Sequence, residues 1–128
     1  MRSRDTLVRL CRFRVEEKRR QVQDIDAMIQ DFLRKYDDLD QTVKFEEQRT
    51  GIADPAHFNY STAAKATRGR RDNLMKSIGD LKDQLADAQA ALDDSDRELR
   101  KAEMLAEKET GAPAVPSPEM IAAPMLAR

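Results

Sequence analysis

The segment from residue 8 to residue 43 reads VRLCRFRVEEKRRQVQDIDAMIQDFLRKYDDLDQTV, and its apolar residues recur every three or four positions. A mean spacing of about 3.5 residues is the heptad pattern of coiled-coil helices. Positions a and d of the heptads fall on Val8, Cys11, Val15, Lys18, Val22, Ile25, Ile29, Phe32, Tyr36, Leu39, Val43 and Glu46. Ten of these twelve residues are apolar, and no Gly or Pro occurs between residues 2 and 50. We therefore predict a helix over residues 4–50.

A second heptad pattern follows the first. Its positions a and d hold Ala64, Thr67, Arg71, Leu74, Ile78, Leu81, Leu85, Ala88, Leu92, Ser95, Leu99, Ala102 and Ala106, of which ten are apolar. Gly69 and Gly79 lie off these positions, and each costs about 1 kcal/mol relative to Ala in a helix. They weaken the helix without interrupting its apolar face, so we predict a second helix over residues 61–109.

A turn is predicted over residues 51–60 (GIADPAHFNY). Gly51 is suited to the left-handed conformation that ends a helix. Asp54 and the proline after it suggest an N-cap followed by a short helical turn. Either Asn59 or Ser61 can cap the second helix.

The chain beyond the second helix contains four of the five prolines. Gly111 and Pro113 are placed to end the helix, and residues 111–128 are predicted to be a disordered tail. The large apolar residues of this tail are candidates for a short docking motif, namely Met120, Ile121, Met125 and Leu126.

Composition and charge indicate how the helices pair. Charged residues make up 37% of the 128 residues and aromatic residues 5%, which favours one long-helix domain over a compact globule. The net charge is +5 over residues 1–20, −4 over 21–50, +4 over 61–79 and −5 over 80–109. Folding the chain back at the turn places opposite charges side by side, whereas a parallel homodimer would align like charges. We predict an all-α fold, a long antiparallel two-helix coiled-coil hairpin, and leave open a domain-swapped dimer.

The hairpin has a predicted register in which facing residues have numbers that sum to 110. The pairs are Val43 with Thr67, Tyr36 with Leu74, Ile29 with Leu81, Val22 with Ala88, and Val15 with Ser95. The same register places two polar seam residues near acids, Arg71 within reach of Asp38 or Asp40 and Lys18 near Asp93 and Asp96. Such polar residues set the register of coiled coils.

No pattern indicates catalysis. His57 is the only histidine and Cys11 the only cysteine, and the sequence has no glycine-rich phosphate loop. We expect no enzymatic activity, cofactor or metal site. The net charge of −1 argues against a general nucleic-acid binder. A nucleic-acid binder would have to use the local basic blocks, and each of these has an acidic partner block. No signal peptide or membrane span is expected, and the predicted location is cytoplasmic.

Outward-facing residues at each end of the hairpin are candidate contacts. Apolar residues outside the seam gather at the end with both termini: Leu10, Phe13, Met104 and Leu105. They form a docking surface or the frayed end of the coiled coil. The same end carries a basic collar of Arg2, Arg4, Arg9, Arg12, Arg14, Lys18, Arg19 and Arg20. At the turn, Phe45, Phe58 and Tyr60 either close the hairpin or contact a partner.

The chain resembles the flagellar export protein FliJ family, stalk components of the bacterial type III export apparatus. The resemblance covers residues 1 to 109 and rests mainly on residues 3–20 (SRDTLVRLCRFRVEEKRR) and on the turn, residues 51–58 (GIADPAHF). Residues 70–74 (RRDNL) and the turn are similar to those of the alphaproteobacterial branch.

The resemblance implies a non-enzymatic stalk similar to the γ subunit of F-type ATPases. Such a stalk binds a hexameric export ATPase, links it to the cytoplasmic domain of the export gate, and in some members binds export chaperones. It would lie at the flagellar base, peripheral to the cytoplasmic membrane through its partners. The implied ATPase contacts are Leu10, Arg12, Phe13, Arg19 and Arg20. The weaker implied contacts, with the gate or at the tip, are Phe58, Tyr60, Arg70, Arg71 and Leu74. The alternative is a coiled-coil scaffold or tether unrelated to export.

Overall fold

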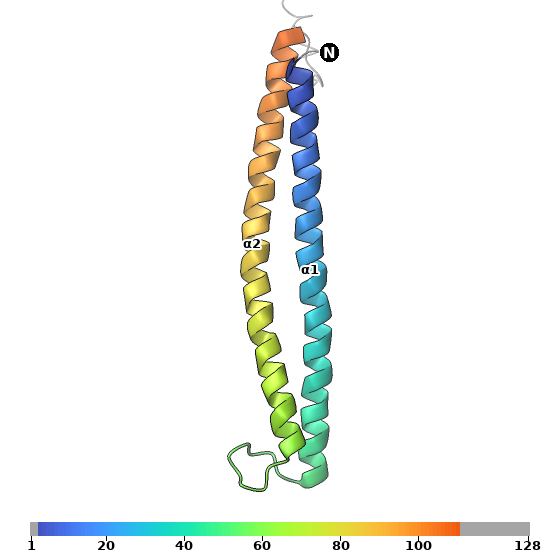
Figure 1. The fold of residues 1–128 in the computed structure, drawn as a ribbon, viewed down its shortest axis with the longest axis vertical. Helices are drawn as coiled ribbons and strands as arrows, with labels where there is room; N and C mark the ends of the chain where they lie inside the picture. The colour runs from blue at the N-terminus through green and yellow to red at the C-terminus, as the bar shows by residue number, and fades with distance from the viewer. Residues whose placement is uncertain (1–2, 111–128) are drawn as a thin grey trace, which may run out of the picture. The chain divides into compact units, whose positions relative to one another are not determined.

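The computed structural model describes residues 3–110, which are all-helical apart from the turn (Figure 1). Helix α1 spans Ser3–Thr50 and helix α2 spans Thr62–Thr110. The two helices pack against each other in opposite directions, so the predicted antiparallel hairpin is confirmed. Neither described helix is long and apolar enough to cross a membrane. The helix stop at Gly111 and Pro113 and the predicted tail lie outside the described residues.

The turn is built from the local hydrogen bonds that its sequence indicates. Gly51 has a φ of 77°, and its N–H donates to the carbonyl of Glu47 at 2.9 Å, as a left-handed helix stop requires. The Asp54 carboxylate accepts the N–H of Ala56 at 2.9 Å, but the residues after it form successive turns and not the predicted helical turn. Ser61, and not Asn59, caps α2, because its hydroxyl accepts the N–H of Ala64 at 3.1 Å.

The core is the predicted seam between the helices. Eleven of the twelve buried residues in the described chain occupy predicted a or d positions, and the exception is Tyr60 in the turn. The remaining a and d residues are half-buried, including the polar Lys18, Glu46 and Arg71. Burial therefore follows the heptad pattern along both helices.

The chain divides into two compact units, which we call the turn unit and the terminal unit. The turn unit is Arg20–Gln89, and the terminal unit consists, in the described chain, of residues 3–19 and 90–110. The core of the turn unit is Ile29, Ile78 and Leu81, with half-buried Ile25, Phe32, Leu33, Tyr36, Leu74 and Leu85 packed against it. The core of the terminal unit is Val8, Cys11 and Ala102, with Leu99 and Ala106 packed against it. Both clusters fit the predicted register.

Ion pairs across the seam follow the predicted charge blocks within each unit. In the terminal unit these pairs are Arg4–Glu109 at 3.2 Å, Arg12–Glu103 at 3.5 Å and Arg14–Glu98 at 3.9 Å. In the turn unit they are Arg71–Asp40 at 2.9 Å and Arg68–Glu47 at 3.7 Å. Each pair joins an arginine of a basic block to an acid of the facing acidic block. Lys18 forms no ion pair with Asp93 or Asp96 in the described chain.

Candidate partner-binding surfaces

The terminal unit exposes five large apolar side chains. They are Leu7 at 39% exposure, Leu10 at 44%, Phe13 at 56%, Met104 at 57% and Leu105 at 41%. We call this group the terminal apolar face. It contains the four residues singled out in the sequence, together with Leu7. Leu7 was not among the predicted residues, although its position g, outside the seam, was a signal that it would be exposed. Only nine such side chains are exposed in the whole described chain, so the terminal unit holds more than half of them.

Heptad geometry places part of this face on one edge of the seam. Arg14 and Glu98 occupy g positions, and their 3.9 Å ion pair shows that facing g positions lie within reach of each other. Leu7 and Leu105 are the g residues one heptad closer to the helix ends. Leu10 lies one turn from Leu7 on α1. These three leucines therefore form the centre of the terminal apolar face, with Phe13 and Met104 on its outer flanks.

The arginines of the terminal unit are partly neutralised. Arg12 is paired with Glu103, and Arg19 with Glu16 of the same helix at 2.9 Å. Arg4 pairs with Glu109 and also donates to the carbonyl of Leu105 at 3.0 Å. Arg9 is exposed and forms no ion pair with a described residue. The predicted collar is thus a mixture of bound and available cations, and Arg2 lies outside the described residues.

The implied ATPase contacts are divided between the units. Leu10, Arg12, Phe13 and Arg19 belong to the terminal unit, whereas Arg20 belongs to the turn unit. The Arg20 side chain is exposed and has no ion-pair partner in residues 3–109. All five of these residues are solvent-accessible on α1.

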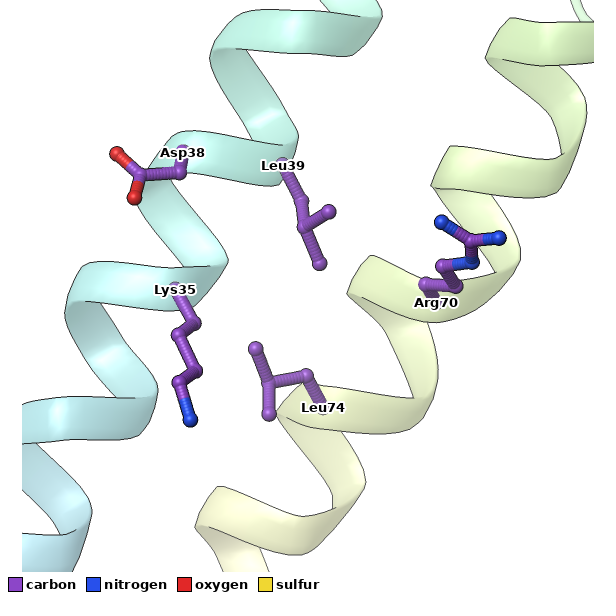
Figure 2. Close-up of a pocket in the computed structure, with 5 residues that line it drawn as sticks. All are labelled: Lys35, Asp38, Leu39, Arg70 and Leu74. Carbon is purple, nitrogen blue, oxygen red and sulfur yellow. The ribbon is translucent and has the colours of Figure 1, made fainter.

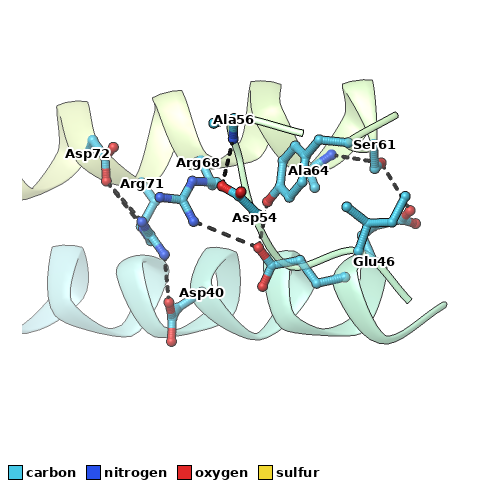
Figure 3. Close-up of polar contacts among 12 residues, drawn as sticks. Asp40, Glu46, Asp54, Ala56, Ser61, Ala64, Arg68, Arg71 and Asp72 are labelled. Atoms are coloured by element: carbon cyan, nitrogen blue, oxygen red, sulfur yellow. Dashed lines mark hydrogen bonds and ion pairs between the residues drawn. The ribbon is translucent and has the colours of Figure 1, made fainter. Parts of the chain in front are cut away.

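Polar contacts close the turn end of the hairpin (Figure 3). The Tyr60 hydroxyl donates to Glu47 at 2.6 Å, and Arg68 lies 3.7 Å from the same carboxylate. Burial, followed by the hydrogen bond and charge of Glu47, raises the pKa of Tyr60 above its usual value of 10.0. Tyr60 is only 9% exposed, so it closes the hairpin and offers little surface to a partner.

Arg71 is also engaged within the hairpin. Its guanidinium lies 2.9 Å from Asp40 and 3.2 Å from Asp72, and its side chain is only 15% exposed (Figure 3). Hydrogen bonds from Lys44 and then from Arg71 lower the pKa of Asp40 below its usual value. The predicted pairing of Arg71 with an acid of α1 is confirmed, with Asp40 as the partner.

The most exposed apolar side chain of the described chain lies in the turn. Phe58 is 89% exposed and stacks on His57, with ring centroids 4.9 Å apart. The N–H of Asn59 donates to Nδ1 of His57 at 3.0 Å, which holds the imidazole in place beside the phenyl ring. Phe58 therefore remains available as a contact residue.

A shallow groove between the helices brings two of the implied tip residues together (Figure 2). The groove has a volume of about 380 Å³ and is lined by Lys35, Asp38, Leu39, Arg70 and Leu74. Leu39 and Leu74 project from the two helices toward the space between them, with charged side chains around them. Arg70 has no ion-pair partner in residues 3–109, whereas Lys35 pairs with Asp31 at 3.2 Å. Sequence reasoning missed Lys35, Asp38 and Leu39, because a groove depends on which side chains leave space between the helices.

The two candidate surfaces differ in chemistry. The terminal apolar face is a group of large apolar side chains with arginines nearby, and the groove of the turn unit is a small apolar floor with charged walls.

Comparison of the chain with protein-family models, with curated proteins and with solved structures finds no match.

Proposed function

We propose that this chain is a non-enzymatic stalk and coupling component of a bacterial flagellar type III export apparatus. In this role it binds the hexameric export ATPase and links it to the cytoplasmic domain of the export gate. The proposal rests on the resemblance of residues 3–20 and 51–58 to the FliJ family. The structural observation that supports it best is the terminal apolar face with exposed arginines beside it.

The chemistry of the two ends suits two different partners. A partner that buries Leu10 and Phe13 gains free energy from the removal of apolar surface from water. Arg12, Arg19 and Arg20 add attraction to an acidic surface and raise the rate of association. At the other end, exposed Phe58 and the groove beside Arg70 and Leu74 are the candidate contacts with the gate.

Hydrolysis by the flagellar-type export ATPase of the same organism provides the direct test. We expect saturable stimulation when the purified full chain is titrated into the enzyme, together with formation of ATPase hexamers. Absence of both stimulation and binding would overturn the proposal and favour the scaffold or tether. A scaffold of this kind would instead self-associate into larger assemblies.

Charge reversal at the basic positions tests the proposed ATPase surface. The variant Arg12→Glu/Arg19→Glu/Arg20→Glu should bind the ATPase more weakly while its helicity is retained. A control with the same change in charge reverses three exposed arginines that pair within their own helix: Arg34, Arg49 and Arg97. If both variants lose affinity equally, net charge and not this surface determines binding.

A further inference from the structure

The terminal apolar face lies next to the point where the described chain ends. Leu105 is five residues before Thr110, an axial distance of about 7.5 Å along a helix. In the hairpin register Phe13 faces residue 97, so the far edge of the face lies about 20 Å from Thr110. The chain that follows Thr110 therefore starts beside this face.

The five members of the face are 39–57% exposed, so the described side chains leave much of it open to solvent. Large apolar side chains that are grouped on a surface mark sites of association. The cations beside the face do not provide a cover either, because Arg4, Arg12 and Arg14 are turned to acids of α2. An occupant of this face must therefore supply apolar side chains.

The sequence after Thr110 supplies side chains of this kind. Residues 120–127 read MIAAPMLA and contain no charged residue. Four of these eight residues are large and apolar, in two adjacent pairs, Met120-Ile121 and Met125-Leu126. Methionine and leucine side chains adapt well to an irregular apolar surface.

The connecting segment is long enough for this apolar segment to reach the face. Nine residues separate Thr110 from Met120, and a chain advances at most about 3.3–3.6 Å per residue. Their maximum reach of about 30 Å exceeds the 20 Å to the far edge of the face. Three prolines in this connection, Pro113, Pro116 and Pro118, favour an extended chain. A tethered segment of this length also has a high effective concentration at the face.

We propose that residues 120–126 fold back and dock on the terminal apolar face of the same chain. The inference concerns the chain alone and does not depend on the identity of its partner. It has a regulatory consequence, because Leu10 and Phe13 cannot be buried by this segment and by another protein at the same time. Docking of the segment would thus compete with any partner that uses this face.

Paramagnetic relaxation in the full-length chain tests the docking. A nitroxide is attached at Ile121→Cys in a Cys11→Ala background, and amide signals are recorded. We expect loss of the signals of Leu7, Leu10 and Leu105, whereas those of Met75 and Phe58 remain. The matched control carries the same label together with Met120→Asp, Met125→Asp and Leu126→Asp, and it should recover the lost signals. Persistent loss in this control would reflect the tether alone and would overturn the proposal, as would no loss in the first sample.

A mixed sample distinguishes docking within one chain from docking between two chains. In this sample the nitroxide is carried by chains without ¹⁵N. The amide signals come from ¹⁵N-labelled chains that carry no nitroxide. Signal loss here would assign the face to a second copy and overturn intrachain docking. A second measurement avoids the Cys11 substitution. The variant Met120→Asp/Ile121→Asp/Met125→Asp/Leu126→Asp, otherwise native, should shift the amide signals of the terminal apolar face. Unchanged signals would contradict the proposal.

Discussion

The stability of the turn unit should depend strongly on single seam residues such as Leu81. It is 6% exposed and packs with Ile29 and Ile78. We expect Leu81→Asp to destabilise the hairpin by about 3 kcal/mol or more, because a carboxylate in this position is buried without a partner. Thermal unfolding followed by circular dichroism measures the loss. Met75→Asp is the matched control, since Met75 lies on the same helix and is 43% exposed. Equal stability of the two variants would contradict the register.

Asp40 makes the stability of the hairpin depend on pH in the acidic range. Hydrogen bonds from Lys44 and Arg71 lower its pKa, so the folded state binds a proton less readily than the unfolded state. The resulting stabilisation is present above about pH 4, and it is lost as the pH falls through the lowered pKa. We expect Asp40→Asn to lower the melting temperature at pH 7 and to flatten its decline below pH 4. Asp38→Asn is the control, because Asp38 forms no ion pair with a described residue; equal acid profiles would exclude this role for Asp40.

Individual contacts differ in how far the sequence could predict them. The pairing of Arg71 with an acid of α1 was predictable, because a long cation at a seam position has few acids within reach. The contact between Tyr60 and Glu47 was not predictable. It depends on the path of a turn whose residues have no periodicity, so the sequence left open whether Tyr60 closes the hairpin or contacts a partner, and it named no acid for its hydroxyl.

The helices and their ends could be predicted because they depend on sequence patterns that act over short distances. The heptad pattern identified the buried face of each helix because burial in a two-helix hairpin depends only on the direction in which a side chain points. Gly51 and Ser61 marked helix ends because their local hydrogen bonds do not need tertiary contacts. The groove beside Leu39 and Leu74 was missed, since it arises where neighbouring side chains fail to fill the space between two helices.

Gly79, inside α2, and Gly51, at the end of α1, should respond in opposite directions to substitution by alanine. A Cβ at Gly79 would meet no atom within 4 Å, and the residue lies inside α2. Gly79→Ala should therefore stabilise the hairpin by about 0.5–1 kcal/mol. Gly51 also has open space but a φ of 77°, so Gly51→Ala should destabilise by about 1 kcal/mol. Melting temperatures of the two variants measure this contrast, and a gain at Gly51 would contradict its role as the helix stop.

Across the described chain, candidate contact residues were easier to find in the sequence than to assign to a partner. Apolar residues off the seam were visible in the sequence, and Leu10, Phe13, Met104 and Leu105 are exposed in the structure. Arg71 and Tyr60 were equally good candidates by residue type, yet their side chains bind acids of α1. Whether a polar residue is available to a partner depends on the contacts it already makes. The partners themselves stay predictions that rest on the resemblance.

The charge blocks are expected to favour the antiparallel pairing of the helices, and exchanging charges across the terminal unit tests this expectation. Arg12 and Arg14 pair with Glu103 and Glu98, and all four lie beyond the first and last turns, so helix dipoles have little effect on them. Arg12→Glu/Arg14→Glu should lower the stability by about 0.2–1 kcal/mol for each exposed pair, because acids would face acids. Glu98→Arg/Glu103→Arg should do the same.

The combined variant, with all four charges exchanged, should recover most of the stability, since the pairs are restored with opposite polarity. Thermal unfolding at low salt measures the four states of this cycle, and the differences should shrink at 1 M NaCl, where the screening length is about 3 Å. If the combined variant is as unstable as the two variants changed on one helix only, these residues act within their own helices. The alternation of charge would then not explain the antiparallel pairing, and the seam residues alone would have to select it.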